Sequence, residues 1–319
     1  MSVYNDEPFV AAAIESILGQ SFGDFEFLIL DDGSTDRSGE IVEAYARRDA
    51  RIRAIRRENR GLAVSLNELT ALAAGERIAR MDADDVSLPT RFERQIAFQN
   101  AQPEYGVVGT WCLDIGADGR STGRKVLPQP TDHDGFLRAI EERKPLLAHP
   151  TVMTWTAIAK DVPYRPMFRY CEDHDLWLRL VARTKICSLG EQLYAHRYTP
   201  GQVSQKHVAD QLYGACIAYL AYGERRAGRP DPTEPLPELP PVEALDRLFW
   251  SGASRFADAW VAQSILYSES ALKTDAFDHI LRHVRADGNR DGLWRAALRL
   301  FRLGEPKRAA RLAFALIAK

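Results

Sequence analysis

The chain of 319 residues has few of the features that mark several common protein classes. Its four cysteines lie far apart, with no CxxC pair and no histidine at zinc spacing, which argues against a disulfide framework or a zinc site. No apolar run approaches the roughly 20 residues that span a bilayer. The start, MSVYNDEP, lacks the basic and apolar regions of a signal peptide. We therefore expect a cytoplasmic protein, with any membrane contact made peripherally on the inner face of the cell membrane.

The net charge is also small, at −2, and most of the chain mixes acidic and basic residues. Recognition of a polyanion usually needs a basic face, so we expect no nucleic-acid partner. Two phosphate-binding signatures are absent as well, because the chain contains neither a P-loop nor the GxGxxG fingerprint of dinucleotide-binding folds. Any nucleotide site must therefore use other residues.

What is present in the first half is an alternation of strand-like and helix-like patterns. FEFLIL, residues 25–30, is a near-continuous apolar run, as expected for a parallel strand covered on both faces. Apolar residues at helical spacing separate it from two further short strands, RIRAIRR and RIARM. This βαβαβ pattern predicts an α/β fold with a parallel sheet and right-handed crossovers. The chain begins inside the first strand of this pattern, so we expect its true start to lie upstream of Met1.

The second half changes character along its length. Residues 105–128 read as a hairpin around an Asp118–Gly119 turn, followed by a strand at 151–155 and a helix at 172–183. Beyond about residue 205, helical patterns dominate. Six prolines in residues 229–241 predict an extended linker or clasp, and residues 243–319 predict a small helical bundle.

Aspartates follow two of the predicted strands. Asp31 and Asp32 end one strand, and residues 82–85, with the sequence DADD, end another. Ligands of such sheets bind at the carboxyl ends of the strands, so the two acidic groups should face one crevice. Each group also has an ordinary interpretation, as a turn whose polar side chains cap the following helix.

Three carboxylates within four positions repel one another unless a positive charge neutralises them. An EF-hand does not explain the pattern of Asp82, Asp84 and Asp85, because Ser87 stands at the glycine position of such a loop. Mg²⁺ or Mn²⁺, held by one or two carboxylates and completed by substrate phosphates, would supply the charge. Alone, this supports only a metal–nucleotide site.

Three segments, residues 2–36, 59–85 and 171–180, together resemble family 2 glycosyltransferases of the glycosyltransferase A fold. The likeness covers about residues 2–204 and rests on several motifs in the family's order and spacing. It implies transfer of a sugar from a nucleotide diphosphate to a hydroxyl, with inversion at the anomeric carbon. It also implies a catalytic domain at 1–205, with a nucleotide-binding half (1–100) and an acceptor half (101–205). A helical region at 206–319, including the linker at 229–241, would follow.

The resemblance assigns the donor side residue by residue. Asp82, Ala83 and Asp84 match the DxD motif, in which the first Asp approaches the donor's ribose or sugar and the second holds Mn²⁺ or Mg²⁺. Asp85 is a candidate helper. Uridine is the favoured base only because it is the commonest in the family. The remaining nucleotide-sugar contacts that the resemblance implies are Val3, Tyr4, Asn5, Glu7, Asp31, Asp32, Asn59, Gly61 and Asn67.

The acceptor side is assigned in the same way. Asp173 resembles the catalytic base of the family's Glu-Asp motif, with Glu172 the weaker candidate, and an inverting displacement does need a carboxylate opposite the leaving diphosphate. The ordinary interpretation of both residues is N-terminal capping of their helix. His149 and Arg197 are pocket candidates, although a buried structural histidine explains His149 equally well. Relatives commonly carry Arg-x-His where this chain has Arg197 followed by Tyr198 and Thr199.

The acceptor would be a glycan or a lipid-linked sugar. The QxxRW motif of processive synthases is absent, which favours addition of a single sugar. Two other function classes stay open here: a sugar-phosphate nucleotidyltransferase, which would need a Gly-rich loop after the first strand, and a non-catalytic nucleotide-binding assembly protein. Residues 293–319 hold seven Lys or Arg and one acid. Their pattern is that of a basic amphipathic helix on an anionic membrane, a homodimer contact, or a plain helical hairpin with a solvated basic face.

Overall fold

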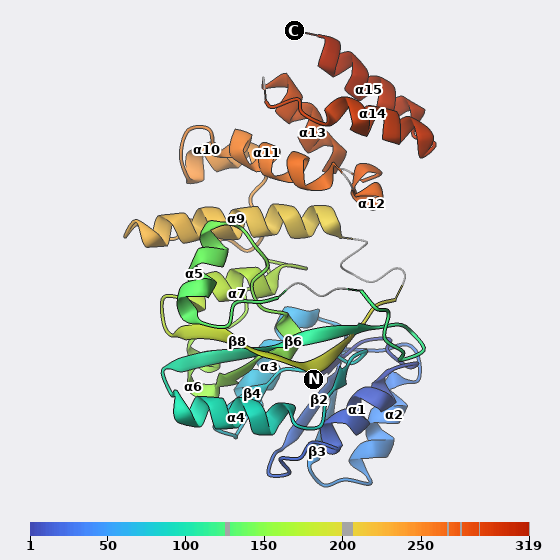
Figure 1. Ribbon diagram of the computed structural model, residues 1–319, viewed down its shortest axis with the longest axis vertical. Coiled ribbons are helices and arrows are strands. Elements are labelled where there is room, and N and C mark those ends of the chain that lie inside the picture. Colours follow the sequence, from blue (N-terminus) through green and yellow to red (C-terminus); the bar gives the residue numbers. More distant parts are fainter. Residues whose placement is uncertain (125–127, 200–206, 267, 275, 287, 319) are drawn as a thin grey trace. The chain divides into compact units, whose positions relative to one another are not determined.

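The computed structural model describes residues 1–124, 128–199, 207–266, 268–274, 276–286 and 288–318 (Figure 1). The chain divides into two compact units. The sheet unit comprises Met1–Pro166 and Arg179–Thr199, and the helical unit comprises Met167–Leu178 and Pro200–Lys319. The predicted domain boundary at residue 205 stays a prediction, and the units place residues 167–178 with the helices.

The sheet unit begins with the predicted βαβαβ arrangement. Strands β1 (Ser2–Val3), β2 (Phe27–Asp31) and β3 (Ile52–Arg56) form a parallel sheet in the order β1-β2-β3. All five residues of β2 are buried, which explains its near-continuous apolar sequence. The connecting helices are α1 (Val10–Leu18) and α2 (Ser38–Ala46), and α3 (Leu62–Leu72) follows β3. The predicted α/β fold is confirmed.

A second, mixed sheet completes this unit. Its order is β4-β7-β6-β8-β5, in which only β6 and β8 run parallel. The expected parallel pairing therefore ends with β3, because β4 pairs with a strand from about 75 positions later in the sequence. A parallel bridge from Ser2 to Asp82 joins the two sheets. The strands are β4 (Arg77–Ala79), β5 (Val86–Ser87), β6 (Tyr105–Ile115), β7 (Met153–Trp155) and β8 (Lys185–Arg197).

The predicted hairpin at 105–128 is only partly present. Its turn forms, since Gly119 has a positive φ of 77° and its N–H donates to the Gly116 carbonyl. The second arm makes one isolated bridge, from Ser121 to Ile115, and residues 125–127 of that arm lie outside the described residues. β6 instead pairs along its length with β8, a strand that follows about 80 positions later.

Helix α4 (Arg91–Ala101) fastens the strands that carry the acidic turn. The fully buried Arg91 guanidinium donates from Nη2 to the carbonyls of Arg80 and Val152 and from Nε to Gln95. Gln95 in turn donates to the Val108 and Thr151 carbonyls. These bonds fix the segment that leads into residues 82–85. The other helices of the unit are α5 (His133–Glu141), the 3₁₀ turn η1 (His149–Thr151) and α6 (Thr156–Asp161).

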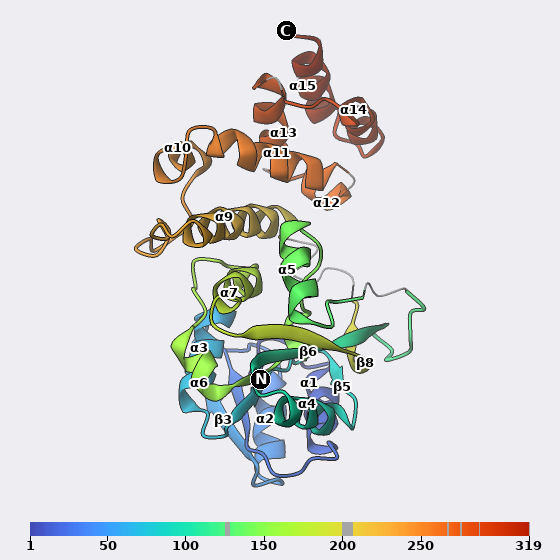
Figure 2. The ribbon, with the colours of Figure 1, turned by 60° about the vertical axis from the view of Figure 1, so that its left-hand side comes forward.

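The helical unit is built almost wholly from helices, as predicted (Figure 2). The proline-rich residues 229–241 form neither helix nor strand, and they act as a clasp because the Tyr213 hydroxyl donates to the Pro240 carbonyl at 2.6 Å. Among the described residues, no helix is long and apolar enough to cross a bilayer. The helices are α7 (Glu172–Leu180), α9 (Val208–Arg226), η2 (Val242–Ala244), α10 (Leu245–Leu248), α11 (Ala253–Ile265), α12 (Glu269–Leu272), α13 (Ala276–Arg285), α14 (Leu293–Arg302) and α15 (Pro306–Ile317).

Candidate active site

The loop after β1 is tied to the loop after β2 by backbone-to-side-chain hydrogen bonds. The Asn5 N–H donates to the Ser34 hydroxyl at 3.0 Å, and the Asn5 side-chain oxygen accepts from the Thr35 N–H at 2.8 Å. The next N–H, that of Asp6, donates to the Ser38 hydroxyl at 2.8 Å. Asn5 has a φ of 56°, a conformation that asparagine tolerates better than most residues. The sequence SVYND therefore forms one rim with DDGSTD.

The other predicted residues of this segment differ in exposure. Val3 is fully buried in the core, so its side chain cannot reach a ligand. Glu7 accepts a hydrogen bond from the Arg37 N–H at 3.1 Å and helps to close the same rim. Tyr4 exposes 49% of its surface and is the large side chain here that is open to solvent. Stacking of a base on an exposed ring is chemically available at Tyr4.

Asp31 and Asp32, the predicted nucleoside contacts, are both buried and both engaged by the chain itself. Asp31 accepts from the Ser34 N–H at 2.9 Å, and its second oxygen lies 3.3 Å from the Arg56 Nε. Asp32 accepts from the N–H groups of Arg60 and Gly61, each at 2.9 Å.

Asp32 also forms an ion pair with Arg57, which sequence reasoning missed. Its carboxylate therefore holds the predicted Asn59–Gly61 segment in place. Gly61 has a positive φ of 88°, and a Cβ on Gly33 would lie 2.7 Å from the Asn59 nitrogen. The two loops are thus packed too closely for a side chain at Gly33, and Asn59 is left exposed at their edge.

Asn67 and His149 converge on one residue that the sequence did not single out, Tyr164. The Asn67 amide exchanges two hydrogen bonds with the Tyr164 backbone, both at 2.8 Å. The His149 Nε2 lies 2.8 Å from the Tyr164 hydroxyl, and His149 is buried. Both side chains therefore order the segment around Tyr164, which supports the structural interpretation of His149.

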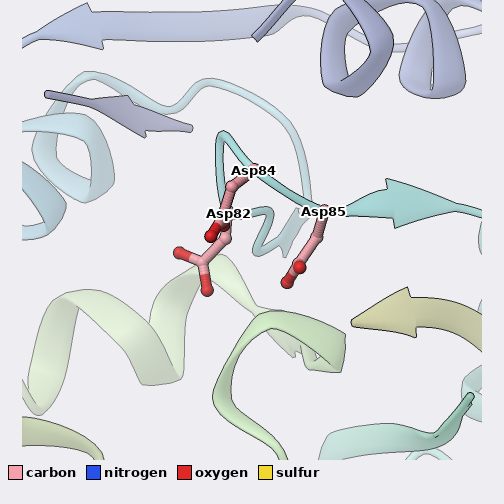
Figure 3. Close-up of side chains that lie close together, drawn as sticks. All are labelled: Asp82, Asp84 and Asp85. Carbon is pink, nitrogen blue, oxygen red and sulfur yellow. The ribbon is translucent and has the colours of Figure 1, made fainter. Parts of the chain in front are cut away.

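The acidic turn lies at the end of β4, beside β1. The carboxylates of Asp82, Asp84 and Asp85 offer oxygen atoms within 4.8 Å of one another (Figure 3). The Ser2–Asp82 bridge and the Val3–Asp31 pairing place this turn and Asp31 on either side of β1. The two acidic groups are therefore brought to the same end of the sheet, while the crevice that they were expected to share stays a prediction.

Arg197 holds the shape of this turn. Its N–H donates to the Asp85 carboxylate at 2.6 Å, and its Nε donates to the Asp84 carbonyl at 2.6 Å. The same guanidinium donates to the Gly116 carbonyl at 2.9 Å and is buried. Arg197 therefore acts on the acidic turn through the backbone, rather than as an open cation in a pocket.

The turn carries more negative charge than its neighbours neutralise. Asp82 is paired with Arg80, whose guanidinium is buried. Burial lowers the pKa of Arg80, but nearby negative charges, first that of Asp82, raise it above its ordinary value overall. Burial, followed by the charge of Asp82, raises the pKa of Asp84, and the same two causes together with Asp84 raise the pKa of Asp85 well above its ordinary value. Arg80 thus pairs with one carboxylate of the turn, and the Arg197 guanidinium reaches the turn at the Asp84 carbonyl.

A fourth acid, Asp6, belongs to the same cluster although sequence reasoning passed over it. Burial, and then the charges of Asp84 and Asp82, raise its pKa to about 7. Its signal was its place between the recognised Asn5 and Glu7. A site of several hard carboxylate oxygens with an unmet positive charge fits Mg²⁺ or Mn²⁺.

The predicted acceptor motif begins α7 in the helical unit. Asp173 accepts from the His174 N–H at 2.8 Å, and the same oxygen lies 3.4 Å from the His174 Nδ1. Burial would lower the pKa of His174, but the hydrogen bond to Asp173 and the charges of Asp173 and Glu172 raise it overall. Glu172 is buried. Carboxylates in a first helical turn are also stabilised in their charged form by the helix dipole.

The backbone before this motif is held in an unusual conformation. Tyr170 has a φ of 70°, in the left-handed region that a tyrosine rarely adopts. Its ring stacks on that of His207 with centroids 3.9 Å apart. A Cβ on Gly214 of α9 would come within 2.2 Å of the Cys171 sulfur, so close packing of α9 sets the start of α7. The placement of Glu172 and Asp173 is therefore built into the helical unit.

Comparison with known proteins identifies the family. The sequence profile described as Glycosyl transferase family 2 matches residues 1–154. The protein named "Putative glycosyltransferase EpsE" from Bacillus subtilis (strain 168) is 34% identical over 227 residues, covering 69% of this chain and 80% of the relative. The chain belongs to glycosyltransferase family 2. The "O-antigen biosynthesis glycosyltransferase WbnJ" of Escherichia coli is 33% identical over 187 residues, covering 57% of this chain and 70% of that protein.

The solved structures agree with this family fold. The crystal structure of residues 1–349 of S. aureus TarS in complex with UDP aligns with a TM-score of 0.58 and 17% identity. The alignment covers 99% of this chain and 86% of that one. At this identity the likeness shows the fold alone. As a family 2 glycosyltransferase the chain is an enzyme, so the nucleotidyltransferase and the non-catalytic assembly protein are set aside.

Proposed function

We propose that this glycosyltransferase moves a single sugar from a nucleotide diphosphate sugar, with UDP as the favoured nucleotide, to a hydroxyl of a glycan or lipid-linked acceptor. Family membership supports the reaction class. The UDP in the S. aureus TarS structure supports the nucleotide, and the O-antigen role in the name of the E. coli relative supports a polysaccharide acceptor. The observation that carries the proposal is the acidic turn beside β1, with its surplus of negative charge.

The donor diphosphate would meet the chain at this turn. Asp84 and Asp82 would hold Mn²⁺ or Mg²⁺, with Asp85 as a helper, and the ion would supply positive charge to the leaving diphosphate. Arg80, which pairs with Asp82, would fix the direction of that carboxylate. Arg197 sets the backbone of the turn through the Asp84 carbonyl. These residues therefore preorganise the carboxylates before the donor binds.

The nucleoside would lie at the rim formed by the loops after β1 and β2. The exposed Tyr4 ring and the exposed Asn59 offer a stacking surface and a polar contact at this rim. Asp31 and Asp32 shape it from below, because their carboxylates are bonded to the loops themselves. Asn67 would act indirectly, because its amide donates a hydrogen bond to the backbone carbonyl of Tyr164.

The acceptor hydroxyl would lose its proton to Asp173 as it attacks the anomeric carbon. Bond formation on one face and departure of the diphosphate from the other inverts that carbon. His174, bonded to Asp173, would stabilise the carboxylate in its charged form until the proton arrives. Glu172 is buried and would position the helix start, so its loss should act through stability.

Calorimetric titration tests the division of labour. The protein is titrated with UDP, GDP and dTDP, each with and without Mn²⁺, and the sugar nucleotides of the binding base are then screened for transfer. Asp84→Asn should lose the metal-supported part of donor binding. Asp173→Asn should keep donor binding but lose transfer. Asp24→Asn, an exposed carboxylate without a partner among the described residues, is the matched control and should change neither. Equal loss of donor binding in the first two variants would contradict the assignment.

A further inference from the structure

Helix α14 carries two apolar stripes, and only one of them faces the core. Leu293, Ala296, Ala297 and Leu300 are buried within the core of the helical unit. On the outside, Trp294, Leu298 and Phe301 expose 53%, 53% and 65% of their surfaces. Their spacing of four and three residues places them in one row along the helix. A helix at the surface of a globular domain normally turns a polar face to solvent, so this second stripe requires a partner.

A row of arginines runs beside the exposed stripe at the same spacing. Arg295, Arg299 and Arg302 line a cavity of about 380 Å³ together with Leu298. None of the three forms an ion pair with any residue that the structure describes, and α14 contains no acidic residue. Other arginines of the helical unit do form ion pairs, for example Arg225 and Arg311 with an aspartate and Arg308 with a glutamate. The row is therefore a concentrated, uncompensated positive charge.

The charge decides among the possible occupants. A second copy docked about a two-fold axis on this face would set the arginine row against itself, with no acid on α14 to pair with it. A nucleic acid would use the arginines but would leave the aliphatic Leu298 in water. An anionic bilayer satisfies both rows, because lipid phosphates attract the arginines while the acyl boundary accepts the apolar side chains.

We propose that α14 lies in the plane of an anionic lipid surface. Trp294, Leu298 and Phe301 insert at the boundary between headgroups and acyl chains, and Arg295, Arg299 and Arg302 bind lipid phosphates from the adjacent face. The buried stripe keeps the helix attached to its own unit during this contact. The proposal does not rest on the identity of the sugar donor.

Each arginine near an anionic surface should strengthen binding roughly five-fold, so removal of all three should weaken it about a hundred-fold. The test is flotation of the full chain with vesicles of phosphatidylglycerol and phosphatidylcholine in equal parts, beside vesicles of phosphatidylcholine alone. The wild-type protein should float with the anionic vesicles only. The triple variants Arg295→Gln/Arg299→Gln/Arg302→Gln and Trp294→Gln/Leu298→Gln/Phe301→Gln should each lose this binding.

A matched control distinguishes the effect of where the three arginines lie from the effect of the protein's net charge. Arg47→Gln, Arg48→Gln and Arg53→Gln remove the same charge from exposed positions of the sheet unit and should leave vesicle binding unchanged. All six changed residues of α14 are solvent-facing or lie at the cavity, so circular dichroism and the melting temperature should stay near wild type. UDP binding by each variant is measured in parallel, which distinguishes a failed membrane contact from a failed donor site.

Three results would overturn the proposal. The first is failure of the wild-type protein to bind anionic vesicles. The second is equal loss of binding in the control and in the arginine variant, which would show attraction by net charge alone. The third is a dimer, detected by analytical ultracentrifugation, that the Trp294→Gln/Leu298→Gln/Phe301→Gln variant converts to monomer while vesicle binding is absent.

Discussion

Two groups of aspartates end strands in the sheet unit, and they differ in what neutralises them. Asp32 accepts two backbone N–H groups and pairs with Arg57, and Asp31 accepts from Ser34 and lies beside Arg56. In contrast, the acidic turn gathers three carboxylates, of which Asp82 pairs with Arg80, while the Arg197 guanidinium bonds to the Asp84 carbonyl and Asp6 adds a fourth carboxylate. The same residue type at the same edge of a sheet thus serves either to close loops or to attract a ligand. Internal compensation, rather than burial alone, separates the two cases.

The sharpest test of this contrast is the loss of Asp84. Asp84→Asn should lower transfer about a thousand-fold, because several kcal/mol of charge stabilisation at the diphosphate would be lost. Its melting temperature without added metal should not fall, since the substitution relieves repulsion in a charge surplus. Initial rates with saturating Mn²⁺ and differential scanning fluorimetry in EDTA give the two readouts. Destabilisation of Asp84→Asn by more than that of Asp32→Ala would break the comparison.

Asp32→Ala should show the opposite pattern to Asp84→Asn, because its main effect should be on the stability of the fold. The substitution breaks a buried ion pair, leaves Glu68 as the remaining acidic partner of Arg57 and frees two backbone N–H groups, at a cost of about 3 kcal/mol. Urea unfolding, followed by circular dichroism, measures this loss directly. Asp24→Asn is the control and should be neutral. If Asp32→Ala unfolds like wild type yet no longer binds the nucleotide, then Asp32 is a ligand contact rather than a loop fastener.

How far the sequence predicts these roles depends on the range of the contacts. The position of residues 82–85 at a strand end could be predicted, because an apolar stretch followed by acids is a local signal. The partners of Asp32 could not, since Arg57 and Gly61 approach it only after another strand has formed. The convergence of Asn67 and His149 on Tyr164 joins positions up to 97 residues apart. The local sequence pattern identifies which residues are unusual. Tertiary contacts decide which of these residues already have hydrogen-bond or ion-pair partners within the chain.

The Arg80–Asp82 ion pair should stabilise the fold less than the contacts of Asp32 do. A double-mutant cycle measures its contribution to the free energy of unfolding. Arg80→Met should destabilise the fold by about 2 kcal/mol, less than Asp32→Ala, because water still reaches part of Asp82. Asp82→Asn in the Arg80→Met background should recover part of this loss, which gives a coupling free energy of about 1 kcal/mol. Additive effects of the two substitutions on the free energy of unfolding would show that Arg80 is held by packing and not by the charge of Asp82.

The smallest expected effect is the pH dependence of Asp6. Its pKa of about 7 in the folded chain lies above the ordinary value of 3.8, so the folded state favours the protonated form. This carboxyl therefore contributes its full stability below pH 3.8, and the contribution is lost as the pH rises through about 7. In metal-free buffer at pH 8, Asp6→Asn should be more stable than wild type by about 1 kcal/mol, with no gain at pH 4. Mn²⁺ should reduce the gain at pH 8, because a cation among the carboxylates would favour the charged form that the buried site otherwise disfavours. If the free energies of unfolding of Asp6→Asn and wild type differ by the same amount from pH 4 to pH 8, then Asp6 does not share in the excess negative charge. That excess would then belong to Asp82, Asp84 and Asp85 alone.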